Sequence, residues 1–136
     1  MTSVLTALST SLDGFIAGAD DSPKQPLGMG GERLFNWLFD GDTPSQFNPM
    51  FKMSAVSAAF FDEGVARVGA AITGRRTYDV SEAWGGSGPM PGILFVVTHH
   101  VPEAVPPGDP PCTFVTEGIE RAVTEARVGV PGCGGL

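Results

Sequence analysis

A continuous apolar run near the middle of the chain constrains the fold more than any other feature. Residues 93–98 read Ile-Leu-Phe-Val-Val-Thr, with no charged side chain to mark a solvent-facing side. A strand that lacks alternation of polar and apolar residues is typical of a sheet covered on both faces, and such sheets are mostly parallel. We therefore expect a buried strand here, in the interior of a layered domain.

The segments around this run alternate between strand and helix patterns. A short apolar strand is expected over residues 70–73, with a brief helix after it to about Val80. A third short strand is expected over residues 113–116, and a helix follows because apolar residues recur at helical spacing, at Ile119, Ala122, Val123 and Ala126. This alternation predicts an α/β protein with a mostly parallel sheet.

The first half of the chain is less regular. Residues 4–12 are rich in Val, Leu, Thr and Ser and predict a strand that ends at the turn signal Asp13-Gly14. A short helix is expected over residues 32–39. A second helix is expected to begin after Ser54 as its N-cap and to run to about Arg67.

Length, charge and cysteine content limit the classes of function. A chain of 136 residues is expected to form one domain. Its net charge of -7 argues against binding to nucleic acid or to an anionic membrane, because both require a basic face. No signal peptide or run of about 18 apolar residues is present, so a cytoplasmic protein is expected. Cys112 and Cys133 have no metal-ligand spacing and are expected to be reduced thiols.

The most distinctive local sequence follows the expected strand at residues 70–73. It reads Gly74-Arg75-Arg76-Thr77, a glycine hinge with two adjacent arginines at the start of a helix. Helix N-termini attract anions, and arginine forks match phosphate oxygens. This favours a phosphate-binding corner at the carboxyl end of a strand, where open α/β sheets place their ligands. The alternative is a pair of solvated arginines that pair with Asp79 or Glu82.

A second polar corner follows the apolar run itself. Thr98-His99-His100 supplies a hydroxyl and two imidazoles directly after the strand. These groups suit a second phosphate or the edge of an adenine, and the alternative is an exposed polar loop. No zinc site is expected, because the histidines are adjacent and no Cys-x-x-Cys or His-x-x-x-His spacing accompanies them.

Two glycine clusters are weaker candidates. Gly132-Cys133-Gly134-Gly135 would let the backbone approach a pyrophosphate closely, and the alternative is a frayed tail. Gly28-Met29-Gly30-Gly31 lacks the Lys-Ser/Thr pair of a phosphate loop and reads as a flexible loop. The first interpretation of Asp13 is a turn residue, and the first interpretation of Trp37 is a residue of the hydrophobic core.

Taken together, these segments resemble the dihydrofolate reductase-like family, in particular its branch with the bacterial riboflavin-biosynthesis reductase domain. The most specific element is Thr73-Gly74-Arg75-Arg76-Thr77-Tyr78-Asp79 after a strand. Residues 11–17, 31–38, 95–99 and 113–127 match further parts of the family, so the resemblance covers nearly the whole chain. It implies a single domain over residues 1–136, with a three-layer α/β fold and flanking helices on a mostly parallel central sheet.

The resemblance implies an NADPH-dependent reductase that transfers hydride to a C=N or C=O group of a heterocyclic or small carbonyl substrate. The implied cofactor residues are Gly74, Arg75, Arg76 and Thr77 at the pyrophosphate and 2′-phosphate, Thr98, His99 and His100 on the adenosine side, Ala17 beside the nicotinamide, and Gly134 and Gly135 at the pyrophosphate. Asp13 and the helix that carries Trp37 would face the substrate. The family's catalytic acid lies on that helix, and the candidates here are Asp13 and Glu32.

Members of this family continue for several strands beyond the diglycine. The resemblance therefore implies a chain that is C-terminally truncated and lacks the last strands of the fold. Pro131 also falls where a central strand is expected. A sheet edge left open in this way must be paired or covered, so we expect a homodimer. The alternative function is a catalytically inactive nucleotide-binding or scaffold protein of the same fold.

Overall fold

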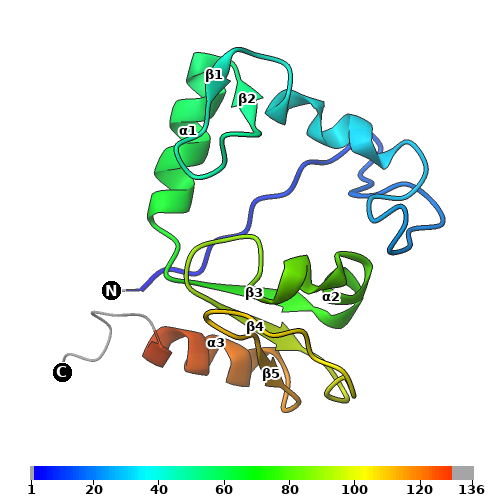
Figure 1. Cartoon of the computed structure of the whole chain (residues 1–136), viewed down its shortest axis with the longest axis vertical. Helices are drawn as coiled ribbons and strands as arrows, with labels where there is room; N and C mark the ends of the chain where they lie inside the picture. Colours follow the sequence, from blue (N-terminus) through cyan, green and yellow to red (C-terminus); the bar gives the residue numbers. More distant parts are fainter. Residues whose placement is uncertain (1, 130–136) are drawn as a thin grey trace. The chain divides into compact units, whose positions relative to one another are not determined.

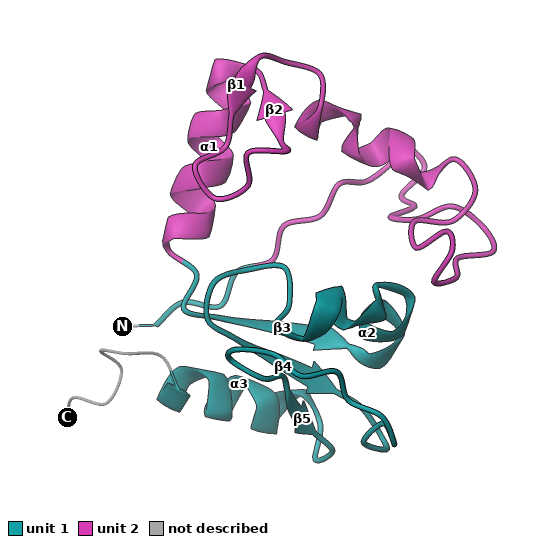
Figure 2. Cartoon of the chain, in the orientation of Figure 1, with its two compact units in different colours: residues 1–5, 68–136 teal, residues 6–67 magenta. Residues whose placement is uncertain are grey.

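The computed structural model of the chain describes residues 2–129. These residues form two compact units, which Figure 2 shows in different colours. Unit 1 contains the described residues up to Leu5 and from Val68 onward, and unit 2 contains Thr6–Arg67.

A parallel sheet forms the centre of unit 1. Its strands are β3 (Ala70–Gly74), β4 (Ile93–Val97) and β5 (Thr113–Val115), in the order β3-β4-β5 (Figure 1). The register pairs Gly74 with Val97 across β3 and β4, and Val97 with Val115 across β4 and β5. The prediction of an α/β protein with a buried parallel strand at the apolar run is therefore confirmed.

Helices cover both faces of this sheet, and the side chains of β4 explain why. Successive strand residues point to opposite faces. Leu94 and Val96 pack with residues of α2 (Arg75–Val80) and of the 3-10 helix η2 (Glu82–Gly86). Phe95 packs on the other face with α3 (Ile119–Gly129). A strand with apolar layers on both sides has no solvent face, so its sequence shows no alternation.

The turn at η2 has an unusual backbone. Glu82, Ala83 and Trp84 have left-handed φ angles of 49°, 55° and 48°. L-amino acids in this region cost roughly 1–2 kcal/mol each because Cβ approaches the following carbonyl oxygen. Burial of Ala83 against Tyr78 and Leu94 offsets part of this cost.

Unit 2 contains two helices and a small antiparallel ladder. The 3-10 helix η1 (Gly31–Leu38) precedes β1 (Thr43–Pro44), which pairs with β2 (Lys52–Met53), and α1 (Ala55–Ala66) follows. Met53 and Ala58 form the core with Leu38, and three phenylalanines pack around them, namely Phe35, Phe51 and Phe61. Ser54 caps α1 as predicted, since its hydroxyl accepts a hydrogen bond from the backbone N–H of Ser57 at 3.2 Å.

One carboxylate fastens the loop before β2 to α1. The buried Ser45 hydroxyl donates to Asp62 Oδ1 at 2.5 Å, and the backbone N–H of Gln46 donates to Asp62 Oδ2 at 3.0 Å. The same Ser45 oxygen accepts a hydrogen bond from the N–H of Phe47 at 3.1 Å. Asp62 is therefore committed to holding this loop.

The prediction of a strand over residues 4–12 is wrong. This segment has no regular secondary structure, and Leu5, Leu8 and Leu12 are exposed within it. Strand propensity mainly reports fit to a neighbouring strand, and residues 4–12 pair with no strand in the described part of the chain. The helix expected over residues 32–39 is present as a 3-10 helix, which ends at Leu38.

None of the helices within residues 2–129 has the length and apolar character needed to cross a membrane.

Candidate functional site

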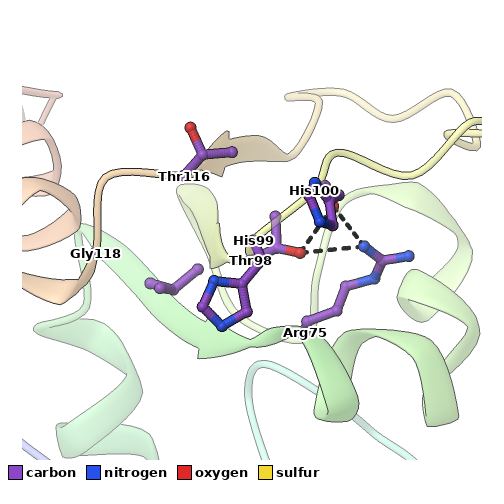
Figure 3. Close-up of a pocket in the computed structure, with 7 residues that line it drawn as sticks. Arg75, Thr98, His99, His100, Thr116 and Gly118 are labelled. Atoms are coloured by element: carbon purple, nitrogen blue, oxygen red, sulfur yellow. Dashed lines mark hydrogen bonds between the residues drawn. The ribbon is translucent and has the colours of Figure 1, made fainter.

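The carboxyl ends of the three parallel strands meet at one edge of the unit 1 sheet, where polar residues follow each strand (Figure 3). Arg75 follows β3, Thr98 and the two histidines follow β4, and Thr116 follows β5. With Val97 and Gly118 they line an open hollow of about 460 Å³. We call this the edge hollow.

Arg75 joins the ends of β3 and β4. Its Nη1 donates to the carbonyl oxygen of His100 at 2.6 Å and to Oγ1 of Thr98 at 3.1 Å. Its Nε donates to Oδ1 of Asp79 one helical turn further along α2, at 2.8 Å. The two corners expected from the sequence thus meet around one guanidinium, and the pairing with Asp79 weighed as an alternative also forms.

Thr98 is buried at the end of β4 and hydrogen-bonded through both its backbone and its side chain. Its backbone N–H donates to the carbonyl oxygen of Val115 at 3.0 Å, which continues the β4–β5 pairing by one step. Its hydroxyl donates to the carbonyl oxygen of His100 at 2.8 Å. His99 and His100 are exposed and line the edge hollow, so their imidazoles are accessible to a ligand.

The third strand end contributes residues that were not among the predicted site residues. Thr116 donates through its backbone N–H and its hydroxyl to Oε2 of Glu117, at 3.1 and 3.3 Å. Gly118 has a φ of 98°, and its carbonyl oxygen accepts the first helical hydrogen bond of α3. Helix α3 therefore begins at the edge hollow, with the positive end of its dipole there. The rule used for the other two strand ends would have found Thr116, because β5 is parallel to them.

Only one of the two adjacent arginines lies in the edge hollow. Among the described residues, Gly74, Arg76 and Thr77 do not line it. Consecutive residues of a helix point in different directions, so a pair at i and i+1 cannot both face the strand ends.

The predicted residues of unit 2 have local roles there. Asp13 Oδ1 accepts a hydrogen bond from the Ser11 hydroxyl at 2.5 Å within a turn, as the interpretation of Asp13 as a turn residue predicts. Glu32 is exposed in the first turn of η1. Trp37 is 38% exposed, so its interpretation as a core residue is wrong, and it donates its indole N–H to Ser9 Oγ at 3.1 Å.

The three remaining sequence candidates are Ala17, Gly134 and Gly135. Ala17 is half-buried in unit 2, before η1, and is not among the described residues that line the edge hollow. Gly134 and Gly135 lie outside the described residues.

Two titratable side chains lie in the core of unit 1. Burial raises the pKa of Tyr78 above its usual 10.0, and the neighbouring Cys112 and Asp79 add to the shift while Arg75 opposes it. Burial likewise raises the pKa of the Cys112 thiol above 9.0, so this thiol is not an activated nucleophile. Within residues 2–129, no group of three or more His, Cys, Asp or Glu side chains could hold a metal ion.

No known family model, curated protein or solved structure matches this chain. The resemblance to the dihydrofolate reductase-like family therefore depends on the sequence motifs alone.

Proposed function

We propose that the chain binds NADPH at the edge hollow and acts as a reductase with the dihydrofolate reductase-like fold. The observation that carries this proposal is the set of bonds from Arg75 to Thr98 and His100. These bonds hold a fixed positive charge against the end of β4, where the exposed His99 and His100 line the same hollow at the carboxyl edge of a parallel sheet. That edge is where α/β sheets bind nucleotides.

The groups that line the edge hollow suit the phosphate-bearing part of a dinucleotide. Arg75 and the imidazoles are hydrogen-bond donors, and the start of α3 adds backbone N–H groups. A volume of about 460 Å³ lies within the range of roughly 300–1,000 Å³ typical of small-molecule sites. These residues would bind and orient the adenosine phosphates, and NADPH would supply the hydride.

Titration with NADPH, followed by its fluorescence or by calorimetry, tests this proposal. Arg75→Ala should weaken binding by roughly tenfold or more, because a charge-assisted hydrogen bond contributes about 1.5–3 kcal/mol. Arg121→Ala is the matched control, since Arg121 makes the same kind of i,i+4 pair with Glu125 at 2.7 Å but does not line the edge hollow. Absence of NADPH binding by the unmodified chain would refute the proposal.

NADH gives a second comparison. The two cofactors differ by the 2′-phosphate alone, so a phosphate site that contains Arg75 should prefer NADPH. Equal affinities would instead favour a general nucleotide- or sugar-phosphate-binding protein.

The proposed reaction is hydride transfer to a C=N or C=O group of a heterocyclic or small carbonyl substrate, with a proton supplied by an acid. Asp13 and Glu32 are the candidate acids, and both belong to unit 2. Loss of the reduced nicotinamide absorbance across a panel of pterins, flavin precursors and small carbonyls measures the activity.

A nucleotide-binding protein without catalysis is the second candidate. The hydrogen bond from Ser11 to Asp13 favours it, because it commits the first candidate acid to a turn. NADPH binding without oxidation across the panel would support this candidate, and measurable turnover would exclude it. Light scattering in the presence and absence of NADPH tests the predicted homodimer in either case.

A further inference from the structure

The guanidinium of Arg75 is shared between the edge hollow and a carboxylate. Arginine presents five N–H donors in a planar fork, and phosphates bind best when they accept two of them side by side. One such pair is formed by Nε and Nη2. Asp79 Oδ1 accepts from Nε at 2.8 Å, so half of that edge is already used.

We infer that Asp79 limits the affinity of the edge hollow for phosphate groups by holding Nε of Arg75, an inference that rests on the proposed function. A phosphate that approaches Arg75 must use the remaining donors or displace the carboxylate. Asp79 is thus a positioning residue that sets how much of the guanidinium a ligand can use.

Three features of the pair make displacement feasible. The Arg75 side chain is 35% exposed and the Asp79 side chain is 49% exposed, so water can solvate the carboxylate after it leaves. Only one contact joins Nε to Asp79, whereas Nη1 is held by two oxygens from the end of β4. The arginine would therefore keep its place while the carboxylate moves.

The charge of Asp79 acts in the same direction. A carboxylate that shares an arginine with a bound phosphate repels it across a partly exposed surface. Removing one such charge at a separation of several ångströms should tighten binding by about fivefold at low ionic strength, and salt should reduce this gain.

The test compares Asp79→Ala with the unmodified chain, with NADPH and inorganic pyrophosphate as probes. Glu125→Ala is the matched control, because it removes an equal charge from the Arg121–Glu125 pair on α3, which does not line the edge hollow. Asp79→Asn provides a second variant that removes the charge but keeps an acceptor near Nε. Thermal melts establish that each variant is folded, as expected for loss of a partly exposed pair.

A tighter complex in Asp79→Ala, with a smaller gain in Asp79→Asn and none in Glu125→Ala, supports the inference. The gain must also shrink when Arg75→Ala is already present, because Asp79 is inferred to act through Arg75. Unchanged or weaker binding in folded Asp79→Ala, or an equal gain in the Arg75→Ala background, overturns the inference alone. Absence of binding by every protein, the unmodified chain included, overturns the proposed function as well.

Discussion

The buried hydroxyl of Tyr78 gives a sharp test of the unit 1 core. The residue is 4% exposed, and its ring packs edge to face on Phe114 with the ring centroids 5.4 Å apart. Within residues 2–129, the hydroxyl oxygen is buried and has no hydrogen-bond partner. A hydroxyl in this position loses its bonds to water on folding and gains none in return.

Tyr78→Phe should therefore raise the free energy of unfolding. The unpaired hydroxyl costs about 1–3 kcal/mol of desolvation, and phenylalanine keeps the ring contacts with Phe114, Leu94 and Val96. The small void left by the oxygen offsets part of this gain, because its lining atoms lose dispersion contacts. We expect a net increase of about 1 kcal/mol.

Urea unfolding followed by circular dichroism measures the change. Tyr78→Ala is the control that removes the ring, and it should lower the free energy of unfolding by about 3–5 kcal/mol. A decrease of 1 kcal/mol or more in Tyr78→Phe would refute the reasoning, since it would show that the hydroxyl is hydrogen-bonded in the folded chain.

Three further predictions concern stability. Glu82→Gly should raise the free energy of unfolding by about 1 kcal/mol, because Glu82 has a left-handed φ of 49°. Glu63→Gly within α1 is the control and should lower the free energy of unfolding by a similar amount. Urea melts of both variants measure the two changes, which should be opposite in sign. Ser54→Ala should lower the free energy of unfolding by about 1 kcal/mol through loss of the α1 cap, measured in the same way. Burial raises the pKa of Cys112 above 9.0, so the folded chain holds this proton more tightly than the unfolded chain does. Stability should therefore decline as pH rises above about 9, and melts of Cys112→Ser should show a later onset, nearer the usual value of 10.0 for tyrosine.

Much of unit 1 can be predicted from sequence because its signals are local and strong. The apolar run at residues 93–97 contains the information that layers cover both of its faces. Residues 4–12 have similar strand-forming composition, yet pairing depends on a neighbouring strand that composition does not specify. The two-residue strands β1 and β2 are too short to show any period, and Pro44 reads as a breaker.

The sequence was sufficient to predict that the candidate site lies at the ends of the parallel strands. Parallel strands bring their carboxyl ends to one edge, so Arg75 and Thr98 were expected to be neighbours. The bond from Arg75 to the carbonyl oxygen of His100 was not predictable, because it depends on a loop backbone that no side chain specifies. The left-handed turn that begins at Glu82 was also not predictable, because Glu, Ala and Trp have no preference for left-handed backbone angles.

The edge hollow has a further property that follows from the order of its residues. Its described lining residues all fall between Arg75 and Gly118, one uninterrupted stretch that begins after Thr6–Arg67 has ended. The described lining of the edge hollow therefore belongs to one continuous segment of the chain. Replacement of residues 6–67 by recombination or engineering would therefore exchange both candidate acids, Asp13 and Glu32, and would leave the described lining of the edge hollow unchanged.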